Sequence, residues 1–463
     1  MRKGLVFILA LLSFSCSLSR SKVEPYPTGA VFPLEEAGRV EIEGKLNDTL
    51  VKGEDGRLYF STDKGHLYCL DGAARQLLWH QTNPSPFGGP PLLSPDRLLV
   101  WDEDNTVSCY DRQGKPGWKT KVSERISGSI SADRQRVYVG TEAGDLIALN
   151  LTTGEPVWRF RTKGALAAAA VFYKDSIITG SSDGSVYLVG SKGVGRGTIE
   201  LGSPVLVTPL VDGDLFYVGT EDFTFYCYDL RSLKRKWKIK AGGRVIASPS
   251  ADERRVYLQA SNSVLYALDK SGGEILWWWI APSRSFYELA FDGPRVLVTS
   301  RSPLLFSLDR RTGKVIGKYQ AKTEIRSNPV WSDPNLVFGT SDSQADRGII
   351  SFLRKEVKVG ITPSLSSPRP AGTEISFTAS ATGFYLPRYE FYLRQGEEKS
   401  VVQKAAEKNS WVWFTEKEGT YAVGVKITDE RQTQEAEISY EISKIEKQTE
   451  GQERSKKEKK DET

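Results

Sequence analysis

A motif of about 40 residues recurs eight times along this chain and limits what the chain can fold into. Its clearest copy runs from Arg136 to Trp158, RVYVGTEAGDLIALNLTTGEPVW. The third residues of successive copies are always 39 or 40 residues apart. These third residues are Tyr59, Leu99, Tyr138, Ile178, Tyr217, Tyr257, Leu297 and Val337. Such a regular repeat predicts an array in which each copy is one supersecondary unit.

Each copy has the pattern of a β-meander. In the clearest copy, the β-branched and aromatic run RVYVG precedes a polar turn, a second apolar run LIALN, a Thr-Gly turn and a Trp-bearing run. This order predicts strands joined by hairpins. An apolar stretch before each copy, such as Ala165–Val171, adds an inner strand. The chain is therefore predicted to be all-β, with an eight-bladed β-propeller of four-stranded blades over residues 36–354.

The two ends of this repeat array complement each other. The eighth copy ends at Leu353 without a Trp-bearing strand, whereas an unassigned stretch, VEIEG, occupies residues 40–44. We therefore predict that residues 39–44 form the outer strand of the last blade and close the ring.

The motif resembles the pyrroloquinoline-quinone (PQQ) propeller repeat, which reads roughly VYVGSxDGxLYALDxxTGxxxW. Val137–Trp158 matches this pattern almost throughout. The resemblance implies that the Trp of one blade docks against the next blade. The residues at that position are Trp79, Trp118, Trp158, Trp237 and Trp277. Gly317 stands there in the seventh copy and the fourth copy has no clear Trp, so looser junctions are expected after those two blades.

The first residues read as an export signal. Arg2 and Lys3 precede an apolar stretch that ends in LSFSC, and residues 1–16 are predicted to be a signal peptide. LSFSC resembles a bacterial lipobox, in which Cys16 would carry the lipid, although Ser13 replaces the usual Leu. The alternative is an ordinary secretory signal that is cleaved nearby. Residues 17–35 are polar and contain proline, and are predicted to be a tether.

The repeat ends near residue 354. Strands are predicted at 356–361, 374–380, 388–393, 410–414, 419–428 and 435–443. The segment with Gly419 and Tyr421 resembles the tyrosine corner of immunoglobulin-like (Ig-like) domains. Residues 355–444 are therefore predicted to form a small Ig-like β-sandwich. Residues 445–463 are almost all charged or polar and predict a disordered tail, with a docking segment as the alternative.

Composition excludes several classes of function. The net charge of +5 is too small and too dispersed to predict nucleic-acid binding. Cys69, Cys109 and Cys227 take the place that Ala148 has in its copy, so they are predicted to be buried thiols without a disulfide.

PQQ dehydrogenases share the repeat, so an enzyme is one alternative. The resemblance implies that such enzymes carry a calcium-binding carboxylate set, a catalytic Asp and commonly two adjacent Cys. This chain has no Cys-Cys pair, and its uniform copies leave no room for long insertions. Asp102–Asn105 and Gly193–Gly197 fit turns better than calcium or phosphate sites, and the two His residues, His66 and His80, do not suggest zinc. No catalytic residue, metal ligand or cofactor is predicted.

Trp278 stands between two other Trp residues on a predicted strand. Alternation points it away from them, either to solvent as a partner contact or into packing between blades.

A lipid-anchored propeller without insertions resembles the BamB family of outer-membrane lipoproteins. The resemblance implies a non-catalytic scaffold that binds envelope proteins, acts in outer-membrane β-barrel assembly, and is attached to the outer membrane by its lipid while facing the periplasm. Two alternatives remain: a ligand- or glycan-binding sensor and a PQQ-dependent dehydrogenase.

Overall fold

The computed structural model describes residues 34–444 apart from residues 129, 285, 342–345, 385–386 and 430–432. The described residues form β-strands and connecting turns, without an α-helix. The predictions for the signal peptide 1–16, for Cys16, for most of the tether 17–35 and for the tail 445–463 lie outside the described residues.

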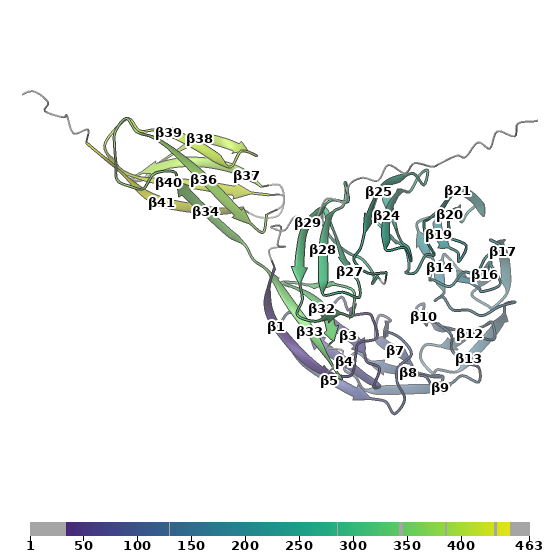
Figure 1. Cartoon of the computed structure of the whole chain (residues 1–463). Coiled ribbons are helices and arrows are strands. Elements are labelled where there is room, and N and C mark those ends of the chain that lie inside the picture. The colour runs from purple at the N-terminus through teal and green to yellow at the C-terminus, as the bar shows by residue number, and fades with distance from the viewer. Residues whose placement is uncertain are drawn as a thin grey trace, which may run out of the picture.

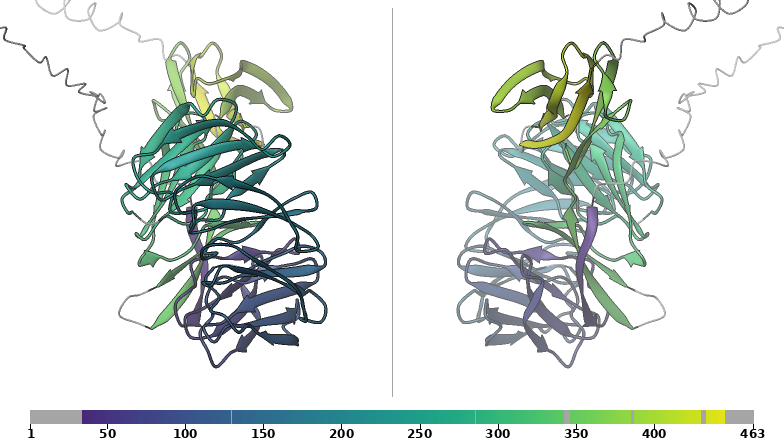
Figure 2. Two further views of the ribbon diagram at one scale, coloured as in Figure 1. Left: turned by 90° about the vertical axis from the view of Figure 1, so that its right-hand side faces the viewer. Right: turned by 90° about the vertical axis from the view of Figure 1, so that its left-hand side faces the viewer.

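Eight antiparallel sheets follow one another around a ring (Figure 1), and the ring is seen from its sides in Figure 2. In the first seven sheets, called blades 1–7, each strand pairs with the next one along the chain. Blade 1 comprises β2 (Val51–Lys52), β3 (Arg57–Ser61), β4 (His66–Asp71) and β5 (Gln76–Thr82); blade 2 comprises β6 (Leu92–Leu93), β7 (Arg97–Trp101), β8 (Thr106–Asp111) and β9 (Pro116–Lys121); blade 3 comprises β10 (Ser131–Ala132), β11 (Arg136–Gly140), β12 (Asp145–Asn150) and β13 (Pro156–Arg161); blade 4 comprises β14 (Val171–Tyr173), β15 (Ser176–Gly180), β16 (Ser185–Gly190) and β17 (Gly195–Glu200). Blade 5 comprises β18 (Leu210–Asp212), β19 (Leu215–Gly219), β20 (Thr224–Asp229) and β21 (Lys234–Lys240); blade 6 comprises β22 (Ser250–Ala251), β23 (Arg255–Gln259), β24 (Val264–Asp269) and β25 (Ile275–Ile280); blade 7 comprises β26 (Ala290–Asp292), β27 (Arg295–Thr299), β28 (Leu304–Asp309) and β29 (Val315–Gln320).

Blade 8 joins the two ends of the ring. It contains β30 (Glu324–Ile325), β31 (Val330–Ser332), β32 (Asn335–Ser341) and β33 (Arg347–Lys355), and its outer strand is β1 (Leu34–Glu43). β1 runs antiparallel to β33, from Leu34 opposite Lys355 to Glu43 opposite Arg347. The structure thus places β1 where the sequence predicted strand 39–44. The strand starts earlier than predicted, because Leu34 is buried against Leu297 and Leu353 rather than lying in the tether.

Five of the blade junctions share one arrangement. The docking Trp donates its indole N–H to a backbone carbonyl of the next blade, at 2.9–3.1 Å. Its ring covers a glycine of positive φ in the turn between the last two strands of that blade, where an added Cβ would lie less than 3.0 Å from the ring. The pairs are Trp79 with Gly114, Trp118 with Gly154, Trp158 with Gly193, Trp237 with Gly273 and Trp277 with Gly313. Glycine is required there both by its conformation and by the close approach of the indole.

Two junctions reverse this pair. Gly197 has the Trp position in blade 4, and Leu233 of blade 5, at φ 53°, has the glycine position; its Cδ1 atom lies 3.5 Å from where a Cβ on Gly197 would stand. Likewise, Gly38 of β1 lies under Arg75 of blade 1, at φ 60°. The junction after blade 4 was expected to be looser because it lacks a docking Trp, but the Leu233 side chain fills the space beside Gly197. After blade 7, Gly317 faces a blade whose two outer strands, β33 and β1, are not joined by a turn.

The chain leaves the ring through β33 and then forms two packed sheets (Figure 1). One contains β34 (Lys358–Pro363), β36 (Glu374–Thr382) and β39 (Ser410–Phe414); the other contains β35 (Arg369–Pro370), β41 (Thr433–Ser443), β40 (Gly419–Thr428), β37 (Arg388–Gln395) and β38 (Glu398–Ala406). Buried side chains from both sheets, including Phe377 and Val425, form their common core. The Tyr421 hydroxyl donates to the carbonyl of Lys417, four residues upstream, at 3.1 Å.

A candidate partner-binding edge on the sixth blade

The outer strand of each blade has two rim positions, one and three residues after the docking position. In seven blades both rim positions hold polar or charged residues: His80 and Thr82, Lys119 and Lys121, Arg159 and Arg161, Thr198 and Glu200, Lys238 and Lys240, Lys318 and Gln320, and Arg39 and Glu41. In blade 6 they hold Trp278 and Ile280. Blade 6 is therefore the one described blade whose two rim positions are both apolar.

Charged rim residues of blade 3 contact neighbouring side chains. Arg159 contacts Glu124 at 2.7 Å, and Arg161 contacts the buried Asp145 at 2.6 Å. Charged side chains on an edge strand discourage the pairing of another strand, because that pairing would strip them of water. Blade 3 is protected in this way.

The β25 strand lacks this protection. Its sequence, ILWWWI, contains no polar side chain, and its outer edge pairs with no described strand. Trp278 is 46% exposed and Ile280 is 41% exposed, whereas Trp277 and Trp279 are buried. Trp278 thus lies at the surface and not in the packing between blades. An exposed apolar edge strand is suited to accepting an extended segment of another polypeptide.

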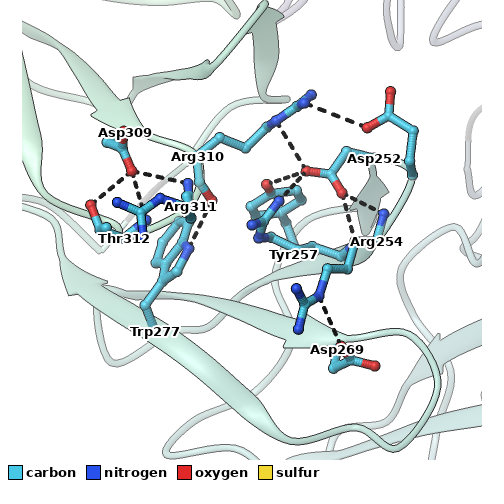
Figure 3. Close-up of polar contacts among 11 residues, drawn as sticks. Asp252, Arg254, Tyr257, Asp269, Trp277, Asp309, Arg310, Arg311 and Thr312 are labelled. Atoms are coloured by element: carbon cyan, nitrogen blue, oxygen red, sulfur yellow. Dashed lines mark hydrogen bonds and ion pairs between the residues drawn. The ribbon is translucent and has the colours of Figure 1, made fainter. Parts of the chain in front are cut away.

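The inner face of β25 is firmly held (Figure 3). The Trp277 indole donates to the carbonyl of Arg310 at 3.0 Å. The turn that carries this carbonyl is fixed by Asp309, whose carboxylate accepts the backbone N–H groups of Arg311 and Thr312. The exposed outer edge of β25 therefore belongs to a strand whose other face is held against blade 7 by the Trp277 hydrogen bond.

The Arg310 side chain completes this lock by reaching back to blade 6, where its guanidinium lies 3.3 Å from the Asp252 carboxylate. Burial opposes ionisation of Asp252, but the Tyr257 hydroxyl and the backbone N–H groups of Arg255 and Arg254 donate to it. These bonds hold the pKa of Asp252 below its ordinary value. The ionised carboxylate can therefore bind Arg310 across the junction.

The three described cysteines do not form a site. Cys69, Cys109 and Cys227 are buried and free. Burial raises the pKa of Cys69 to about 12, and that of Cys109 and Cys227 to about 11. They stay protonated near neutral pH and are poor nucleophiles.

The other candidates from the sequence have local structural contacts. Asp102 is buried and accepts hydrogen bonds from Asn83 and from the backbone of Thr106, both at 2.9 Å. Gly193 lies under Trp158 in a turn. Within the described residues, no group of three or more His, Cys, Asp and Glu side chains is arranged to hold a metal ion. The same residues contain no helix long and apolar enough to span a bilayer.

Comparison with known proteins identifies relatives of the propeller. The sequence profile described as outer membrane protein assembly factor BamB matches residues 35–113, 103–195 and 189–283, which together exceed half of the chain. BamB of Burkholderia pseudomallei is 31% identical over 115 residues, covering 23% of this chain and 30% of that protein. BamB of Nitrosomonas eutropha is 24% identical over 131 residues, covering 28% and 32%. The chain thus matches about a third of the length of these curated relatives.

Solved structures share the fold at low sequence identity. BamB from Moraxella catarrhalis superimposes with a TM-score of 0.59 at 14% identity, covering 69% of this chain and 97% of that one. Quinohemoprotein alcohol dehydrogenase from Comamonas testosteroni also gives 0.59, at 12% identity, covering 70% and 76%. A BamB protein and an alcohol dehydrogenase are equally similar, so these likenesses establish the propeller alone. The profile matches establish the family, and the chain belongs to the outer membrane protein assembly factor BamB family.

Proposed function

We propose that this chain is a non-catalytic scaffold of the cell envelope that binds a protein of the outer-membrane β-barrel assembly machinery. Three consecutive profile matches to an assembly-factor family carry the proposal. The contact surface would be the β25 edge around Trp278, since it is the one outer strand of the described blades with two apolar rim residues.

A β-edge contact explains how a propeller could hold a protein. The incoming segment would hydrogen bond to backbone groups on the outer edge of β25, which supplies affinity, while Trp278 and Ile280 would select apolar side chains. Tryptophan is favoured at such interfaces because it buries a large area with few rotatable bonds.

Site-specific photo-crosslinking in intact cells tests this proposal. A photoreactive phenylalanine analogue at position 278 is expected to form an adduct with an integral outer-membrane assembly protein, identified by mass spectrometry. The matched control places the same analogue at Arg159, the equivalent rim position of blade 3, and is expected to give little of that adduct. Equal adducts at both positions would refute the specific edge, and an adduct only with proteins unrelated to assembly would refute the scaffold role.

We further propose that Cys16 carries a lipid that holds the protein at the outer membrane, facing the periplasm, and that residues 355–444 are an Ig-like module. Incorporation of labelled palmitate that disappears in Cys16→Ser is expected. Labelling that persists in this variant would exclude Cys16 as the anchor.

A further inference from the structure

A pocket of about 510 Å³ lies on one face of the ring where loops of blades 6 and 7 meet the loop that enters blade 1. It is lined by Arg244, Arg284, Arg301, Asp48, Phe286 and Tyr287, among others. A pocket of this size can hold a small organic molecule. The β25 edge is built from other residues, so the pocket is a separate feature.

Positive charge dominates the lining. Arg244 contacts Glu221 at 3.0 Å and Arg301 lies 3.6 Å from Asp48, whereas the exposed Arg284 forms no ion pair with any described residue. Three guanidinium groups therefore face one lining carboxylate. Guanidinium groups bind carboxylate and phosphate oxygens through paired N–H donors.

An unsatisfied polar group lies at the base of the pocket. Tyr287 is only 6% exposed, and its buried hydroxyl, which lies near the Arg301 guanidinium, has no hydrogen bond of ordinary geometry to a described residue. Its backbone is fixed, since its N–H donates to the Thr299 carbonyl and its own carbonyl accepts from Gln259. Leaving a buried hydroxyl unpaired costs about 1–3 kcal/mol, which a ligand atom at that place would offset.

We propose that this pocket binds a phosphoryl group, as a phosphate ester carried by a small molecule or by a lipid headgroup. Three arginines against Asp48 and Glu221 leave one positive charge in excess, which matches an anionic phosphate ester in sign. Its tetrahedral oxygens can accept from arginines on different loops and from the Tyr287 hydroxyl at once, whereas a planar carboxylate cannot reach as many directions. Phe286 and Ile246 add apolar surface for the rest of the molecule.

Calorimetric titration of the full chain with sn-glycerol 3-phosphate tests the proposal, with glycerol as the uncharged control. Saturable binding is expected at millimolar concentration. Arg284→Gln and Tyr287→Phe should each weaken it about tenfold, since each removes one hydrogen bond to a charged oxygen. Arg311→Gln, an exposed arginine in a turn of blade 7 outside the pocket lining, should leave it unchanged.

Flotation with vesicles distinguishes the two sources of the phosphoryl group. Vesicles that contain phosphatidic acid in phosphatidylcholine are compared with phosphatidylcholine alone. Binding to the free ester identifies a soluble ligand, and binding only to phosphatidic acid vesicles identifies a headgroup, provided that Arg284→Gln and Tyr287→Phe weaken it. Absence of both kinds of binding, or binding that Arg311→Gln weakens equally, overturns the proposal. Unchanged thermal unfolding of the variants shows that any loss is not misfolding.

Discussion

Two neighbouring tryptophans on β25 have opposite environments, because side chains alternate along a strand. Trp277 is 7% exposed and its indole N–H is bonded to the Arg310 carbonyl. Trp278 is 46% exposed and contacts solvent. At the scale of single residues, the same side-chain type thus stabilises the ring at one position and is available to a partner at the next.

Alanine substitution should separate these two roles. Trp277→Ala leaves a cavity over Gly313 and an unpaired carbonyl, so it should lower the free energy of unfolding by about 3–5 kcal/mol. Trp278→Ala is expected to change it by no more than about 0.5 kcal/mol. Urea unfolding followed by far-ultraviolet circular dichroism measures both. Similar losses in the two variants would show that Trp278 also supports the fold.

At the scale of elements, seven of the eight described junctions pair one large side chain with one glycine, and the sequence distributes them in two ways. The usual order is Trp on the outer strand and glycine in the next turn. After blade 4 the order is reversed, with Gly197 on the strand and Leu233 in the turn. The volume between the blades is filled in both cases, which is what close packing demands.

This complementarity predicts an energetic coupling between positions 197 and 233. Gly197→Trp alone should clash with Leu233, and Leu233→Gly alone should leave a gap although it relieves the positive φ. The double variant recreates the common Trp–Gly pair. It should be more stable than the sum of the single effects by about 1–3 kcal/mol in a double-mutant cycle. Strictly additive effects would mean that the two positions do not share the junction.

The same elements show what sequence can and cannot predict. Period and strand content predicted the blades, because every copy repeats the same buried positions. The reversed junction after blade 4 was not predicted from the sequence. The role of Leu233 in filling that junction is evident only once the structure places it next to Gly197. The β38 strand was missed because EKSVVQKAA lies at an edge and is largely exposed. Trp278 was found by alternation, whereas the pocket at Tyr287 joins loops that are distant in sequence.

At the scale of the whole molecule, the ring and the sandwich have separate cores. The sandwich core lies between Ile361 and Ile442 and contains no propeller residue. Only Glu356 and Val357 separate β33 from β34. The ring, in turn, depends on β1, which brings the first described residues against the last blade. The propeller should therefore unfold cooperatively when β1 separates from blade 8. The sandwich should remain folded when this happens.

Two thermal transitions are expected in a calorimetric scan of the full chain, since two cores without shared residues need not unfold together. Phe377→Ala removes a fully buried ring from the sandwich, and Phe338→Ala removes one from β32 in blade 8. Each should cost about 3–5 kcal/mol, and each should shift only one transition to lower temperature. The two variants are controls for each other, because they remove the same side chain from the two cores. A single transition that both substitutions lower equally would show that the sandwich and the ring unfold as one cooperative unit.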